Sequence, residues 1–172
     1  MENAANAQAA PVETDAAKRA EARLIAASVS VLVLLGALLQ LAVAPGPVTT
    51  VVFTLLLTLT IVAVAYVVRG RLLDMLGGYR LAAVVLGLLA LASAAGTMVL
   101  QNKPPEFYRA QYGGLSALVS GLRLDDLFHT FWFGALVALM NGGLLVSAAR
   151  RWPVTSRNAG FFLVHLGILV SL

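Results

Sequence analysis

The sequence predicts an all-α protein: a polytopic membrane helical bundle with about five transmembrane helices. Of the 172 residues, 60% are hydrophobic and 12% are charged, whereas soluble domains are about 45–50% apolar and about 25% charged. The apolar residues are gathered into five runs, most of them near the roughly 20 residues that a helix needs to cross a bilayer. The chain has no cysteine, which excludes disulfides, thiolate metal sites and iron–sulfur clusters.

The first part of the chain predicts a tail and a hairpin. Residues 1–20 show no apolar periodicity, so we expect a disordered tail, with helix as the alternative near its end at residues 16–20. The apolar run 24–44 is longer than the core of a signal peptide, which is about 7–15 residues, and therefore indicates an uncleaved helix. A turn at Ala44-Pro45-Gly46-Pro47 separates it from a second helix over 48–68. Residues 24–68 thus form a transmembrane hairpin.

Three further apolar runs follow a short amphipathic connector at 72–80. They predict helices over about 81–100, 128–149 and 159–172, with a polar loop at 101–127 between the first two. The last run would rise only about 21 Å, less than the hydrocarbon core of about 30 Å. We therefore expect this helix to be truncated.

The basic residues predict how the helices are oriented. Nine of the twelve lysines and arginines fall in the tail, in 69–80 and in 150–157, and the other three lie in the loop 101–127. Because basic residues favour cytoplasmic segments, the amino terminus is predicted to be cytoplasmic and the loop to face outward. The basic clusters flank apolar runs and form no basic face, so no nucleic-acid partner is expected; the lipid bilayer is the partner that they indicate.

Two histidines, His129 and His165, are the candidate site residues. An ionisable side chain in a membrane span often marks a functional site, and imidazole is a common protein ligand of haem iron. His165 would lie about 9–10 Å inside the membrane. The alternative is a neutral histidine that hydrogen-bonds a neighbouring carbonyl. His129 stands beside Asp125 and Asp126 at the outward interface, where the alternative is a histidine capped by its acidic neighbours.

The two histidines are expected on the order of 20 Å apart along the membrane normal, so they cannot share one iron. Asp125 or Asp126 is a candidate N-cap of the fourth helix.

Other residues have two explanations each. A set of aromatic residues would anchor the chain at the interface or contact haem, and three arginines would set the topology or attract haem propionates. These residues are Tyr108, Tyr112, Phe131, Trp132 and Phe133, and Arg150, Arg151 and Arg157.

An ordered set of short motifs runs from Leu73 to the end of the chain. They are LDMLGGYRLA (73–82), SAAGTMVLQ (93–101), PPEFY (104–108), QYG (111–113), LDDLFHTFWF (124–133), RRWP (150–153) and GFFLVHLG (160–167). Their order and spacing resemble the amino-terminal membrane portion of the ResB/Ccs1 proteins of system II cytochrome c biogenesis. The resemblance covers residues 73–172, so the hairpin 24–68 is extra relative to that family's core.

The resemblance implies a protein of the bacterial cytoplasmic (inner) membrane that handles haem. ResB-like proteins act with a ResC/CcsA-type membrane protein to carry haem across the membrane and present it to apocytochrome c. By this resemblance haem would be bound non-covalently, with His165 as the ligand of the haem iron and His129 as a further cofactor-binding residue. A large extracytoplasmic domain and a final helix of the family are missing from this sequence.

Two other functions stay open from the sequence: a b-type haem electron-transfer subunit, and a membrane scaffold or assembly subunit without a cofactor. The first requires two histidines at similar depth on facing helices. The sequence offers no nucleophile–base pair, Walker loop or HExxH motif. We therefore expect no enzymatic turnover by this chain alone.

Overall fold

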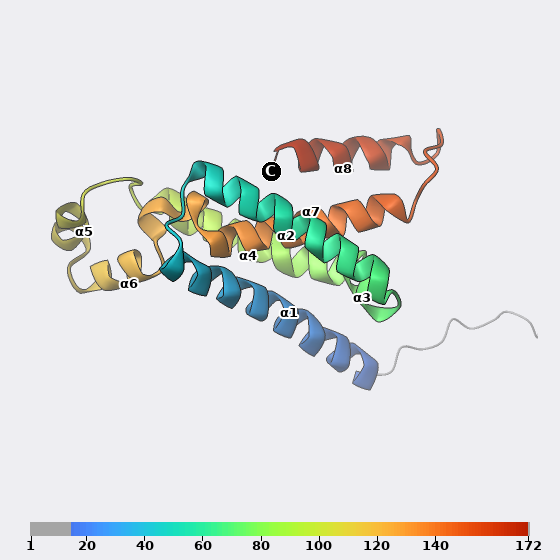
Figure 1. The fold of residues 1–172 in the computed structure, drawn as a ribbon, viewed down its shortest axis with the longest axis horizontal. Helices are drawn as coiled ribbons and strands as arrows, with labels where there is room; N and C mark the ends of the chain where they lie inside the picture. Colours follow the sequence, from blue (N-terminus) through green and yellow to red (C-terminus); the bar gives the residue numbers. More distant parts are fainter. Residues whose placement is uncertain (1–14, 172) are drawn as a thin grey trace, which may run out of the picture.

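The computed structural model describes residues 15–171, and these residues form helices and connecting turns without a strand (Figure 1). Four helices are long and apolar enough to cross a membrane: α1, α2, α4 and α7. This confirms the predicted all-α membrane bundle. The elements in chain order are α1 (Asp15–Ala42), α2 (Pro47–Val68), α3 (Arg71–Leu76), α4 (Tyr79–Met98), α5 (Pro105–Tyr112), η1 (Gly113–Leu115), α6 (Ser116–Gly121), η2 (Leu124–His129), α7 (Phe131–Ala149) and α8 (Ala159–Ser171).

Helix α7 lies at the centre of the bundle. Eleven of its 19 residues are buried, and α1, α2 and α4 each pack against it. Figure 1 shows α7 running between these helices, with α8 folding back along one side. An apolar helix that is buried on most of its circumference is the expected core of a bundle.

Two glycines let the helix backbones approach α7 closely. A Cβ atom on Gly36 of α1 would lie 2.7 Å from the carbonyl oxygen of Phe131, and one on Gly134 would lie 2.7 Å from the hydroxyl of Thr54 in α2. Small residues commonly serve this purpose between membrane helices. The predicted hairpin 24–68 therefore lies directly on α7.

The predicted disordered tail 1–20 was too long, because α1 begins at Asp15. An acidic residue in the first turn and the alanines that follow favour a helix at this place. Glu21 is also ion-paired with Arg80 at the start of α4, which ties this segment to the bundle. Residues 1–14 of the predicted tail lie outside the described residues.

The segment 101–127, predicted as a polar loop, is folded. It contains α5, η1, α6 and the start of η2, and a small core of Val99, Tyr108 and Val119 holds them together. We call the end of the bundle formed by residues 99–130 the loop end. The opposite end, formed by residues 69–80 and 150–158, is the arginine end.

The fifth apolar run forms α8, whose 13 residues make it shorter than the other four apolar helices. None of the residues described along α8 is fully buried. It leaves the arginine end and runs back toward the loop end beside α7 (Figure 1).

Candidate functional site

His165 lies in α8 and is held by a hydrogen bond within its own helix. Its Nδ1 atom is 2.9 Å from the carbonyl oxygen of Phe161. Because a carbonyl can only accept, Nδ1 carries the hydrogen and donates it, which leaves the lone pair of the neutral ring on Nε2. The Phe161 ring also contacts the imidazole, with 3.6 Å between the ring centroids and 34° between the ring planes. The ring is thereby fixed in the tautomer that can coordinate a metal through Nε2.

His165 borders a cleft of about 450 Å³ between α4, α7 and α8 at the arginine end. This volume falls within the range of about 300–1,000 Å³ that is typical of small-molecule sites. The lining is mostly apolar, with Ser147, Arg151 and His165 among its few polar groups. The lining residues are Leu76, Gly77, Gly78, Tyr79, Leu81, Ala82, Val85, Leu139, Met140, Gly143, Leu144, Ser147, Arg151, Phe161 and His165.

A second cleft, of about 460 Å³, lies on the other side of α8 and also reaches His165. Its lining is apolar apart from this histidine. It comprises Leu144, Leu145, Ala148, Val154, Ala159, Phe162, Leu163, His165, Leu166 and Leu169. The imidazole thus stands between two apolar clefts, one on each side of the contact between α7 and α8.

The structure separates the three arginines that the sequence had grouped. The guanidinium of Arg150 is 2.7 Å from Asp74 and also reaches the carbonyl of Leu73, so it fastens α7 to α3. The guanidinium of Arg151 lies over the Phe161 ring, 3.9 Å from its centroid, and borders the first cleft. Arg157 lines neither cleft.

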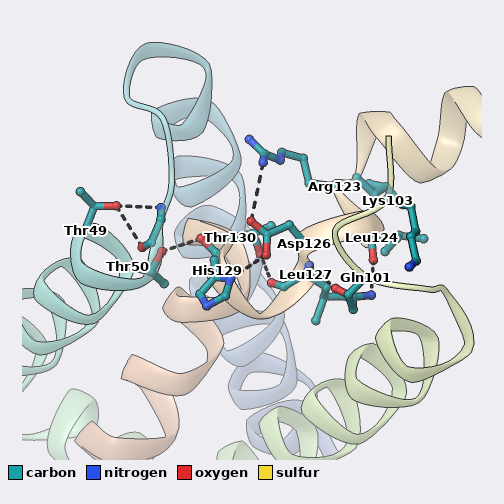
Figure 2. Close-up of polar contacts among 12 residues, drawn as sticks. Thr49, Thr50, Gln101, Lys103, Arg123, Leu124, Asp126, Leu127, His129 and Thr130 are labelled. Carbon is teal, nitrogen blue, oxygen red and sulfur yellow. Dashed lines mark hydrogen bonds and ion pairs between the residues drawn. The ribbon is translucent and has the colours of Figure 1, made fainter. Parts of the chain in front are cut away.

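His129 is the last residue of η2, at the loop end. Its Nδ1 atom is 2.6 Å from a carboxylate oxygen of Asp126, and 37% of its side chain is exposed. The carboxylate accepts the Nδ1 hydrogen, so Nε2 again holds the lone pair of the neutral ring. The main-chain carbonyl of His129 accepts a hydrogen bond from the Thr50 hydroxyl of α2 (Figure 2).

The N-cap of the fourth long helix is Thr130, and the prediction of Asp125 or Asp126 for this role was wrong. The Thr130 hydroxyl accepts a hydrogen bond from the Phe133 amide and donates one to the carbonyl of Leu127. The Asp126 carboxylate instead accepts a hydrogen bond from His129 and pairs with Arg123, whose guanidinium is 3.8 Å away. Helix α7 therefore begins after His129 rather than before it.

Gln101 organises the loop end, and sequence reasoning missed it. Its side-chain amide donates to the carbonyls of Gly96, Val99 and Leu124, and its side-chain oxygen accepts from the Leu127 amide. These bonds join the end of α4 to η2 (Figure 2). A glutamine directly after an apolar helix was the one signal in the sequence, since such a residue can satisfy the free carbonyls of the last turn.

Two of the aromatic residues considered as surface anchors or haem contacts are buried. Tyr108 is only 2% exposed; its hydroxyl donates to the carbonyl of Leu100 and accepts from the Lys103 amide. Phe131 is equally buried and packs against Phe53 of α2. Both rings therefore take part in internal packing, Tyr108 at the loop end and Phe131 at the start of α7.

The structure does not bring the two histidines together. His129 lies just before α7 at the loop end. His165 lies on α8 and borders a cleft with residues 139–147 of α7, toward the arginine end. The 19 residues of α7 span about 28 Å. Among residues 15–171 there is also no group of three or more histidine and acidic side chains able to hold a metal ion. Each histidine would therefore act as a single protein ligand.

Comparison with known proteins identifies the central part of the chain. Residues 79–161 match the ResB-like family. This segment is ResB-like. It contains α4, the loop end and α7 and finishes early in α8, so His129 lies inside it and His165 lies four residues beyond it. The α1–α2 hairpin precedes the ResB-like segment.

Relatives of the ResB-like segment carry the name cytochrome c biogenesis protein CcsB. One from Synechococcus sp. (strain JA-3-3Ab) is 36% identical over 95 residues, which cover 50% of this chain and 20% of that protein. One from Gloeobacter violaceus is 32% identical over 93 residues, covering 49% of this chain and 20% of that protein. The match thus spans about a fifth of the length of these relatives. No solved structure matches the chain.

Proposed function

We propose that this chain is a membrane component of cytochrome c maturation that holds haem non-covalently for delivery to apocytochrome c, together with a ResC/CcsA-type membrane protein. The ResB-like segment and the names of its relatives support the pathway. The observation that carries the haem proposal is His165, which borders two apolar clefts with its Nδ1 hydrogen bond already made.

His165 is the proposed axial ligand of the haem iron. A hydrogen bond from Nδ1 to a second group is what orients a ligating imidazole and increases its basicity. The apolar walls of the clefts suit a flat macrocycle, and haem itself supplies the iron that Nε2 would bind. The same hydrogen bond would also satisfy a histidine with no ligand, so the position of the ring beside the clefts carries the proposal.

The second axial ligand is proposed to come from another subunit or another copy of this chain. The only other histidine, His129, is at the loop end and is engaged by Asp126. This separation also disfavours a b-type electron-transfer subunit, which requires two histidines at similar depth. We assign His129 a role in contacting haem or its propionates on the outward side.

The orientation in the bacterial cytoplasmic membrane follows from charge. Nine basic residues belong to the amino-terminal segment and the arginine end, and three belong to the loop end. We propose that the arginine end and the amino terminus face the cytoplasm. His165 would then receive haem near the cytoplasmic side, and His129 would face the outward side.

An absorption spectrum tests the proposal. The chain is produced with and without a ResC/CcsA-type partner, purified in detergent, and compared with its His165→Ala and His129→Ala variants. We expect a Soret band that the His165→Ala variant loses and the His129→Ala variant largely keeps. A chain that carries no Soret band even with the partner present would refute haem binding and leave the cofactor-free scaffold as the better explanation.

A further inference from the structure

We propose that Arg151 is the carboxylate-binding residue of the His165 cleft, so that bound haem lies with its propionates toward the arginine end. This inference rests on the proposed function, since it concerns how the same cleft orients the same ligand. It selects one residue among the arginines near α8 as the one that would hold the carboxylates of the ligand.

Arg151 is the only arginine that lines the cleft. Its neighbour Arg150 is already bound to Asp74 and to a main-chain carbonyl. No ion pair involves Arg151 among residues 15–171. Its charge is therefore available to an anionic group that enters the cleft.

The guanidinium is also held in place. Its Cζ atom lies 3.9 Å from the centroid of the Phe161 ring, and the same ring contacts the imidazole of His165, with 3.6 Å between the two ring centroids. A cation over an aromatic ring is stabilised by the ring, while the N–H groups at the edge of the guanidinium stay free to donate. Arg151 and His165 thus contact the same Phe161 ring, Arg151 from the segment that follows α7 and His165 from one turn further along α8.

The charge pattern of the cleft fits an anionic ligand with an apolar body. No aspartate or glutamate lines it, whereas the smaller cleft between α1 and α3 carries both Glu21 and Asp74. A guanidinium donates two parallel hydrogen bonds to a carboxylate, and such pairs are stronger where water is partly excluded. Ser147, also in the lining, offers a further hydroxyl.

Comparing the affinities of haem and of its dimethyl ester tests the role of Arg151 separately from haem binding in general. Both probes carry the iron and the macrocycle, but the ester lacks the two carboxylates. We measure the affinity of ferric haem and of ferric haem dimethyl ester for the full chain in lipid nanodiscs, for wild type, Arg151→Gln and Arg157→Gln. The Arg157→Gln control removes the same charge from the same connecting segment but lines no cleft.

We expect Arg151→Gln to weaken haem binding about tenfold and to leave ester binding unchanged. Arg157→Gln should leave both affinities unchanged, and Arg151→Lys should restore part of the loss. Equal weakening of both probes by Arg151→Gln would overturn the inference, because the residue would then only support the fold. Equal haem affinity in wild type and Arg151→Gln would overturn it as well. A wild-type chain that binds neither probe would refute the proposed function itself.

Discussion

The side chain of Gln101 shows how one polar residue can organise the end of a membrane bundle. It lies within hydrogen-bond distance of four main-chain groups in two segments, the end of α4 and η2. Helix ends leave carbonyls without partners, and such groups are costly to bury. Gln101 satisfies them and at the same time fixes η2, which carries Asp126 and His129.

Replacing Gln101 with leucine is expected to destabilise the loop end by roughly 2–4 kcal/mol, because several buried main-chain groups lose their partners. The measurement is hydrogen exchange of residues 124–130 together with thermal unfolding in detergent. The control is Gln111→Leu, since Gln111 is exposed on α5. Equal exchange rates in the two variants would show that the Gln101 bonds contribute little.

Thr50 makes a second test at the residue scale. Its side chain is 6% exposed and donates to the main-chain carbonyl of His129. Thr50→Val keeps the shape but removes the donor, and we expect a loss of about 1 kcal/mol in unfolding free energy. Thr60→Val is the control, because Thr60 is exposed and bonds only the Leu56 carbonyl of its own helix. A loss as large in the control would contradict a specific contribution from the link between α2 and His129.

At the scale of elements, the packing of α1 on α7 depends on a close approach of two backbones. A methyl group at position 36 would meet the Phe131 carbonyl at 2.7 Å, whereas one at Gly87 of α4 would meet nothing within 4 Å. The two glycines therefore differ in function although both lie within long apolar helices. Comparing an alanine substitution at each of the two positions separates the effect on helix packing from the effect on helix propensity.

We expect Gly36→Ala to destabilise the bundle by about 1–3 kcal/mol, since the helices must move apart. Gly87→Ala should be neutral or slightly stabilising, because alanine favours the helix and has room. The midpoint of unfolding in a mixed-micelle titration measures both. A Gly36→Ala variant as stable as Gly87→Ala would show that the contact between α1 and α7 adapts without cost.

The long helices could be predicted from the sequence and the loop end could not. Apolar runs and the Pro45–Pro47 turn mark α1, α2, α4 and α7 to within a few residues, except for the start of α1. The loop end depends on contacts between distant residues, such as Tyr108 with Leu100 and Gln101 with Leu124. Local composition does not determine such pairs, so the sequence predicts a loop at 101–127 and does not single out Thr130 as the N-cap.

The candidate site was predicted in part. Two histidines on separate elements followed from the sequence alone, and His165 does lie within an apolar helix. The sequence does not distinguish Arg151 from Arg150 and Arg157, because the difference depends on which distant residues each side chain contacts. Asp74, which engages Arg150, is 76 residues away in the chain.

At the scale of the whole molecule, the absence of cysteine makes the orientation directly testable. Single cysteines are placed at the exposed positions Lys103 and Arg157, one at each end of the bundle. In intact cells, a maleimide that cannot cross the membrane should label the Lys103→Cys variant, and should label Arg157→Cys only after the cells are opened. The reverse pattern would show that the positive-inside assignment is wrong.

The central place of α7 has a consequence for how the protein is made. Helices α1, α2 and α4 each have their main partner in α7 and pack little on one another within the described residues. Synthesis delivers these three segments to the membrane first, and α7 begins more than thirty residues after α4 ends, so until then the three helices lack their main packing partner. The bundle closes only when the fourth span arrives. A fault in the insertion of α7 is therefore expected to leave α1, α2 and α4 without the helix on which they all pack.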